Sequence, residues 1–112
     1  CPECATIREA DPALRARLGA AFSTIKQTSQ GTGCNHCHGS GYKGRIGIYE
    51  VLTLDDHLRD RIAGSASIHE IRRLVRQKGQ RNIAHHAAER IAAGATTFEE
   101  VLRVLGPQAG ED

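Results

Sequence analysis

Residues 34–50 read CNHCHGSGYKGRIGIYE, and this stretch carries the strongest chemical signal in the chain. It begins with a C-x-x-C pair, and a second C-x-x-C pair occupies residues 1–4. A C-x-x-C turn brings two sulfur atoms to one side, and two such turns complete a tetrahedral shell of four thiolates with Zn–S distances of about 2.3 Å. The pattern therefore predicts one structural zinc ion, bound by Cys1, Cys4, Cys34 and Cys37.

Other interpretations of the four cysteines stay open at this level. They are free buried thiols, or one pair is a redox dithiol, although a redox site needs a single reactive pair and here two pairs compete. A shell of three cysteines and one histidine is a further alternative, with His36 or His38 as the fourth ligand. We expect the remaining histidines, which lie among polar neighbours on predicted helices, to be solvated: His57, His69, His85 and His86.

Outward from the cysteine stretch, the residue spacing predicts a mostly α fold with little β. Apolar residues at spacings of three and four predict one helix over residues 11–25, with an interruption at Gly19. Residues 28–33 are polar and contain glycine, which predicts a loop. Residues 46–54 have apolar side chains on both faces, which is typical of a strand buried on both sides.

Three or four short helices are predicted after the strand. Two of them start with a capping box, Ser67 with Glu70 and Thr97 with Glu100, and glycines end them. The predicted divisions are a tetracysteine zinc-binding subdomain with one helix (1–45), a short strand (46–54), a small bundle of three to four helices (55–106) and a disordered tail (107–112). Because the bundle has its own caps and no cysteine, we expect it to fold largely independently of the metal.

Composition limits the classes of function. The 112 residues have a formal charge of +2, and four thiolates with one Zn²⁺ bring it near zero, so the domain is a poor general binder of polyanions. The sequence has neither an apolar run long enough to span a membrane nor a secretory signal. Two C-x-x-C pairs in a chain without a secretory signal are typical of a reducing compartment. The sequence also lacks the G-x-x-x-x-G-K-[ST] phosphate loop, so we expect no catalytic site and no ATP site in this chain. Its start inside a motif, at Cys1, suggests an excised fragment.

The two cysteine regions resemble those of a known family. The C-terminal zinc region of the ATPases of type II secretion and type IV pilus assembly, the general secretion pathway protein E family, carries C-P-x-C and then C-x-x-C-x-x-[ST]-G-Y-x-G-R-x-G-I-Y-E. Residues 1–4 and 34–50 match these patterns, and residues 94–104 resemble the closing helix of the family. Two positions depart from it: Gln80 stands where Met is usual, and His85-His86 replaces a more acidic pair.

The resemblance implies that this is a C-terminal accessory domain of a hexameric cytoplasmic motor, peripheral to the inner membrane through its partners. The parent protein hydrolyses ATP with Mg²⁺ to power protein secretion or pilus assembly, and residues 46–54 form a strand of its ATPase core sheet. The implied partners are the upstream ATPase core, neighbouring subunits of the hexamer, and inner-membrane secretion or pilus assembly proteins. Neither nucleic acid binding nor direct membrane insertion is implied.

Two other functions compete with this one. Residues 34–41 fit C-x-x-C-x-G-x-G, the repeat of DnaJ-like zinc chaperone modules, but that family uses four repeats and here there is one. A nucleic-acid-binding zinc ribbon is the other alternative, and it favours a more basic and more aromatic surface than this chain offers.

Overall fold

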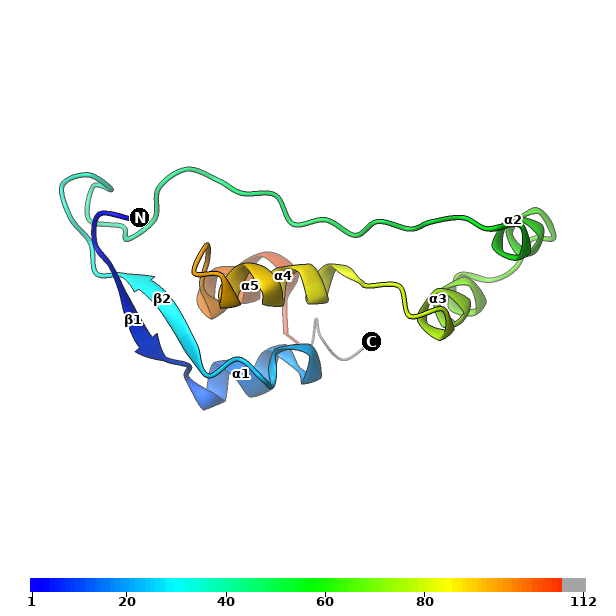
Figure 1. Cartoon of the computed structure of the whole chain (residues 1–112), viewed down its shortest axis with the longest axis horizontal. Helices are drawn as coiled ribbons and strands as arrows, with labels where there is room; N and C mark the ends of the chain where they lie inside the picture. Colours follow the sequence, from blue (N-terminus) through cyan, green and yellow to red (C-terminus); the bar gives the residue numbers. More distant parts are fainter. Residues whose placement is uncertain (108–112) are drawn as a thin grey trace.

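The computed structural model describes residues 1–107; all of the predicted disordered tail except Pro107 lies outside these residues. As predicted, the fold is mostly α with little β (Figure 1). Its elements in chain order are β1 (Ala5–Glu9), α1 (Pro12–Leu18), the short 3-10 helix η1 (Ala20–Phe22), β2 (Gln27–Gly31), α2 (Asp56–Ala63), α3 (Ile68–Gln77), α4 (Ile83–Ala92) and α5 (Phe98–Leu105).

The helices begin where capping side chains satisfy the first backbone N–H groups. Ser67 accepts a hydrogen bond from the backbone nitrogen of Glu70, and Thr97 accepts one from that of Glu100, which confirms the N-cap half of each predicted capping box. The first helix ends at Leu18 because Gly19 adopts a φ of 105°, a left-handed conformation that leaves the helical region.

The two strands form an antiparallel ribbon that the sequence did not predict. Its register pairs Ala5 with Gly31 at one end and Glu9 with Gln27 at the other. The prediction of a loop over residues 28–33 is therefore wrong for residues 28–31, which lie in β2. Every residue of β1 is exposed, and β2 is rich in polar side chains. The ribbon therefore has no apolar face, and its sequence lacks the alternation of apolar and polar residues that predicts a strand.

One hydrophobic core joins the two ends of the chain. Phe22 and Phe98 are both nearly inaccessible to solvent, and their rings meet edge to face with centroids 6.4 Å apart. In Figure 1, α1 lies beside α4 and α5 near the middle of the molecule, whereas α2 and α3 lie at one end. The core residues are Ala10, Leu18, Phe22, Ile25, Ala84, Ala87, Ile91, Phe98 and Val101. Helices on both sides of the predicted strand therefore share one core.

Residues 46–54 form no strand in this structure, so that prediction is wrong for the isolated chain. The segment is extended, runs along the length of the molecule (Figure 1), and has no strand beside it among residues 1–107. Instead, the backbone N–H of Tyr49 donates to Nδ1 of His86 at 2.7 Å. The side-chain amide of Gln80 accepts from the N–H of Thr53 and donates to its C=O, both at 3.0 Å. Side chains thus take the place of a neighbouring strand.

The α2–α3 hairpin is packed lightly. Leu58 is the one buried residue of α2, and no residue of α3 is buried. Among residues 1–107, no helix has both the length and the apolar character that crossing a bilayer requires.

Candidate metal centre

The structure brings the four cysteines together, and their ligand atoms all lie within 4.8 Å of one another. The Sγ atoms of Cys1 and Cys34 are 3.8 Å apart, as are those of Cys4 and Cys37, and Cys34 and Cys37 are separated by 3.7 Å. Four sulfurs at about 2.3 Å from a central ion form a tetrahedron with edges of roughly 3.8 Å. The spacing therefore fits a tetrahedral metal ion.

The β1–β2 ribbon positions both cysteine pairs. Cys4 directly precedes β1, and β2 ends three residues before Cys34, so the pairing of Ala5 with Gly31 places both pairs at one end of the ribbon. Beyond the ribbon, the backbone nitrogen of Thr32 donates to the carbonyl oxygen of Cys4 at 3.3 Å. The two C-x-x-C turns, 29 residues apart in sequence, are thereby held face to face.

Glycines allow the backbone to fold closely around the second pair. A Cβ atom at Gly41, where φ is 83°, would lie 2.7 Å from the carbonyl oxygen of Gly31. A Cβ atom at Gly33 would lie 2.7 Å from the carbonyl oxygen of Gly39. Any larger residue at these crossings forces the backbones apart and disturbs the ends of the ribbon that carry the cysteines.

Backbone amides stabilise negative charge on Cys37, the one buried cysteine. Its Sγ accepts hydrogen bonds from the N–H of Gly41 at 3.1 Å and of Cys34 at 3.3 Å. Burial raises the pKa of Cys37. The two amides and the thiols of Cys34 and Cys4 lower it by more than burial raises it, so the pKa falls to about 6. Cys37 is therefore prepared to bind a cation as a thiolate.

The neighbouring thiol of Cys34 behaves differently. The backbone of Cys37 lowers its pKa, but burial and the thiols of Cys37 and Cys4 outweigh that effect, so the pKa of Cys34 is raised. This thiol would keep its proton more readily until a cation displaces it. The two thiols of this turn thus differ in acidity, and both lose their protons when a metal ion binds.

The histidines lie outside this cluster. Neither His36 nor His38 belongs to the group of close metal-ligating side chains found among residues 1–107. His57, His69 and His85 are exposed, as predicted, whereas His86 is half-buried. His85 and His86 have structural roles that sequence reasoning missed.

The imidazole of His85 accepts from the backbone N–H of Asn82 at 3.2 Å and completes a capping box at the start of α4. His86 is stacked on Tyr49 with ring centroids 5.7 Å apart. A capping box with His in its last position has no standard sequence signature, because Glu or Gln usually fills it. The stacking joins residues 37 positions apart and leaves no local signal.

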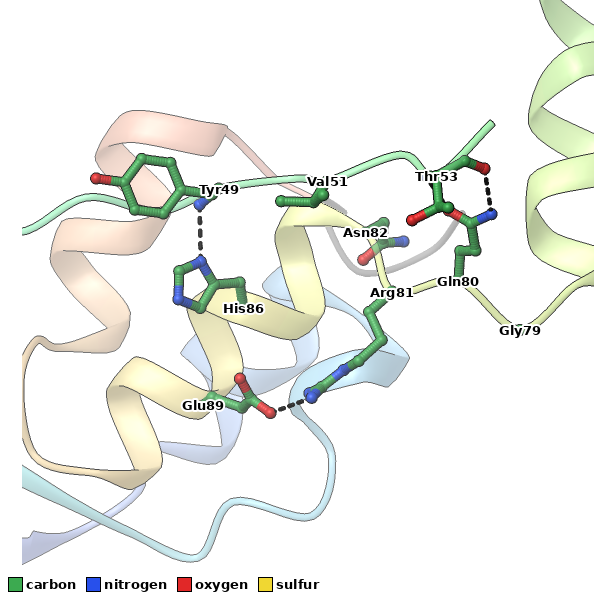
Figure 2. Close-up of a pocket in the computed structure, with 9 residues that line it drawn as sticks. All are labelled: Tyr49, Val51, Thr53, Gly79, Gln80, Arg81, Asn82, His86 and Glu89. Carbon is green, nitrogen blue, oxygen red and sulfur yellow. Dashed lines mark hydrogen bonds and ion pairs between the residues drawn. The ribbon is translucent and has the colours of Figure 1, made fainter. Parts of the chain in front are cut away.

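Two cavities flank the extended segment, away from the cysteines. One, of about 580 Å³, lies between residues 49–53 and the start of α4 (Figure 2). Figure 2 shows the imidazole of His86 below the backbone of Tyr49, and Arg81 directed toward its ion-pair partner Glu89. The other cavity, of about 540 Å³, lies between residues 50–52 and α3.

The sequence matches a known family over nearly its whole length: the model of the type II/IV secretion system protein family matches residues 1–103. The chain is 39% identical to the type II secretion system protein E of Pseudomonas aeruginosa over 104 residues, which are 93% of this chain and 20% of that protein. It is 36% identical to the type IV pilus assembly ATPase PilB of Thermus thermophilus over 91% of this chain and 12% of that protein. It is 33% identical to the type IV pilus assembly ATPase TfpB of Acinetobacter baylyi over 94% of this chain and 18% of that protein.

The chain spans a fifth or less of the length of these three relatives. Within that span it has two C-x-x-C pairs, and the fold brings their sulfurs close together. From the family match and these identities, the chain belongs to the type II/IV secretion system protein family.

Proposed function

We propose that the chain is the zinc-binding accessory domain of a cytoplasmic motor protein that powers protein secretion or pilus assembly. Its metal is one structural zinc ion, bound by Cys1, Cys4, Cys34 and Cys37. The observation that carries this proposal is the spacing of the sulfur atoms, 3.7–3.8 Å for three pairs, which matches the edge of a zinc tetrahedron.

The role proposed for zinc is structural. Four thiolates fill a tetrahedral shell and leave no coordination position for water or substrate, unlike catalytic zinc sites. Structural zinc contributes on the order of 10–16 kcal/mol of apparent binding free energy in small modules. Here that free energy would stabilise the exposed β1–β2 ribbon, which has no apolar face of its own. Because β1 leads directly into α1, the position of the ribbon also sets where α1 begins.

ATP hydrolysis is assigned to the parent protein and not to these residues. Two of the relatives are named ATPases, and this chain covers only 12% and 18% of their lengths. The 112 residues contain no phosphate loop with its lysine. ATP and Mg²⁺ would then bind upstream, and this domain would brace the motor and dock its partners.

The proposed contacts within the motor use the extended segment. Residues 46–54 pair with the sheet of the upstream ATPase core, and other surfaces contact neighbouring subunits of a hexamer and inner-membrane assembly proteins. Support comes from the extended backbone and from apolar side chains that remain in solvent, with Val51 74% and Tyr49 63% exposed. Such a segment fits a place beside a neighbouring strand.

Elemental analysis tests the metal. The wild-type chain is expected to contain one zinc ion, Cys37→Ser to lose it, and His38→Asn to keep it. Asn is the matched replacement because His38 has a φ of 55°, which Asn tolerates. Zinc retained by Cys37→Ser but lost from His38→Asn would show that the metal is bound by three cysteines and His38 instead.

The motor assignment is tested in the full-length protein. Cys37→Ser in that protein is expected to reduce both its assembly into hexamers and its ATP hydrolysis, while the 112-residue chain alone hydrolyses no ATP. ATP turnover by the short chain, or full activity and assembly of the zinc-free parent protein, would contradict the proposal.

A further inference from the structure

The extended segment of residues 46–54 is bound along one edge by side chains from α4 and from the loop before it (Figure 2). Nδ1 of His86 accepts from the backbone N–H of Tyr49. The side-chain amide of Gln80 accepts from the N–H of Thr53 and donates to its C=O. In an extended chain the backbone groups of alternate residues point to the same side. The backbone groups of Tyr49 and Thr53 therefore lie on one edge, which we call the closed edge.

The opposite edge of the segment is open. It carries the backbone N–H and C=O groups of Ile48, Glu50 and Leu52, and we call it the open edge. None of these groups forms a hydrogen bond within residues 1–107. A row of unpaired backbone groups along an extended chain is a pairing site for a further strand. The two edges of the segment therefore differ, since side chains occupy one and the other is available.

The rest of the fold holds both closing side chains in place. His86 belongs to α4, whose buried face packs into the shared core, and its ring is stacked on that of Tyr49. The backbone N–H of Gln80 donates to the carbonyl oxygen of Val75 in the last turn of α3, at 3.4 Å. The side chain of Ile48 also packs against the core. Contacts within this domain thus set the orientation of the segment.

The closing side chains stand at positions where this sequence departs from the family pattern. Gln80 stands where Met is usual, and His86 is one of the two histidines that replace a more acidic pair. A Met side chain has no N–H and only a weak acceptor, so it cannot bind the N–H and the C=O of Thr53 together. Neither Gln80 nor His86 belongs to the cysteine cluster, so the candidate metal centre does not explain them.

We propose that residues 46–54 are an edge strand of the parent protein's core sheet: the open edge pairs with one upstream strand, while His86 and Gln80 close the outer edge. The inference rests on the contact with the ATPase core proposed above, and it names the paired edge and the side chains that set it. An upstream strand is the occupant that fits, because the segment has apolar side chains on both faces, as strands covered by two layers do. Closure of the outer edge prevents a second chain from pairing there.

Proline substitutions distinguish the two edges in the zinc-loaded full-length protein. Proline has no N–H, so an edge strand tolerates it only where that N–H points away from the neighbouring strand. Glu50→Pro removes an N–H from the open edge. Val51→Pro removes one from the closed edge, where the N–H of Val51 forms no hydrogen bond within the described part of the chain. Glu50→Ala and Val51→Ala are the matched controls for the loss of each side chain.

Hydrogen exchange resolved to single amides measures the pairing. In the full-length wild type, we expect the amides of Glu50 and Leu52 to exchange at least about tenfold more slowly than in the 112-residue chain. Glu50→Pro should abolish the protection of Leu52. Val51→Pro should change it by less than about twofold, because proline keeps the residue before it extended.

The closing side chains are tested in the zinc-loaded 112-residue chain. His86→Phe keeps a ring beside Tyr49 but has no acceptor, so exchange of the Tyr49 amide should accelerate about fivefold. His86→Asn should restore the slow rate, because its side-chain oxygen takes the place of Nδ1. Gln80→Met should accelerate exchange of the Thr53 amide by a similar factor. Unchanged rates in His86→Phe and Gln80→Met would show that these side chains do not close the edge.

Two exposed residues provide controls of the same chemistry: His57→Phe for the first change and Gln77→Met for the second. Neither side chain forms a hydrogen bond or an ion pair as far as the structure describes the chain. Both variants should leave the exchange of Tyr49 and Thr53 within about twofold of wild type. Circular dichroism confirms that each variant keeps its helix content.

Each alternative arrangement has its own outcome. Equal loss of protection with Glu50→Pro and Val51→Pro would show strands on both edges, which overturns closure but keeps the contact with the core. Loss with Val51→Pro alone would reverse the two edges. Unprotected Glu50 and Leu52 in the full-length protein would overturn the contact with the core as well. Concentration-dependent protection of these amides in the short chain would show a second copy as the occupant. The zinc measurements above are independent of all four outcomes.

Discussion

The phenolic oxygen of Tyr42 lies 2.6 Å from Oγ1 of Thr97, 55 residues later in the chain. Tyr42 belongs to the loop that follows the second cysteine pair, and Thr97 is the buried N-cap of α5. This hydrogen bond links the metal loop directly to the last helix. The shared core of α1, η1, α4 and α5 adds to that link.

Tyr42→Phe removes this hydrogen bond and leaves the ring in place. Thr97 still caps the N–H of Glu100, so the loss is that of one hydrogen bond, about 1 kcal/mol of the free energy of unfolding. Urea unfolding of the zinc-loaded chain measures it. Tyr49→Phe is the control, because the Tyr49 hydroxyl forms no hydrogen bond among residues 1–107; an equal loss from both variants would show that the Tyr42–Thr97 bond contributes nothing specific.

Gly41→Ala is expected to weaken zinc binding more than Gly39→Ala. Both glycines have φ near 80°, so alanine is strained at either position. Only at Gly41 does the new Cβ meet another backbone, the carbonyl oxygen of Gly31 at 2.7 Å, whereas at Gly39 nothing lies within 4 Å. The extra shift displaces the amide that donates to Cys37, and such contacts around ligands affect metal affinity about 10- to 100-fold.

Competition with a chromophoric chelator measures this difference. Equal zinc affinities for the two glycine variants would show that the close approach of Gly31 and Gly41 does not position the cysteines.

The metal-free chain is expected to lose stability as the pH falls toward 6. The pKa of Cys37 is lowered to about 6 in the folded chain, against about 8.5 for an unperturbed thiol. Because the folded chain favours the thiolate, this contribution is complete above about pH 8.5 and disappears as the pH falls through 6. Urea midpoints across this range should rise with pH for wild type and rise less for Cys37→Ser; parallel curves would exclude the effect.

Phe22→Ala and Leu58→Ala distinguish the shared core from the α2–α3 hairpin. Both side chains are fully buried, and truncation of either is expected to cost about 2–5 kcal/mol locally. Phe22 contacts Phe98, so its loss should increase amide hydrogen exchange in α1, α4 and α5 together. Leu58 lies outside that core, so its loss should increase exchange in α2 and α3 alone. Faster exchange in α4 and α5 after Leu58→Ala would show a single cooperative unit.

Much of the local structure follows from the sequence. The caps at Ser67 and Thr97, the break at Gly19 and the two C-x-x-C turns each depend on residues within four positions of one another. Such contacts form whatever the rest of the chain does, because a side chain beside a helix start or in a tight turn always meets the same backbone groups. Each C-x-x-C pair belongs to this class, but the two pairs meet only because the β1–β2 ribbon brings them together.

The remaining features were decided by tertiary structure. The β1–β2 ribbon pairs polar residues without alternation, and residues 46–54 have the composition of a strand but no neighbouring strand among residues 1–107. The bond between Gln80 and Thr53 and the core contact of Phe22 with Phe98 join residues 27 and more positions apart. Local sequence determines what each segment can form, but which segments meet depends on backbone pairing and apolar burial between distant residues, and neither leaves a periodic pattern in the sequence.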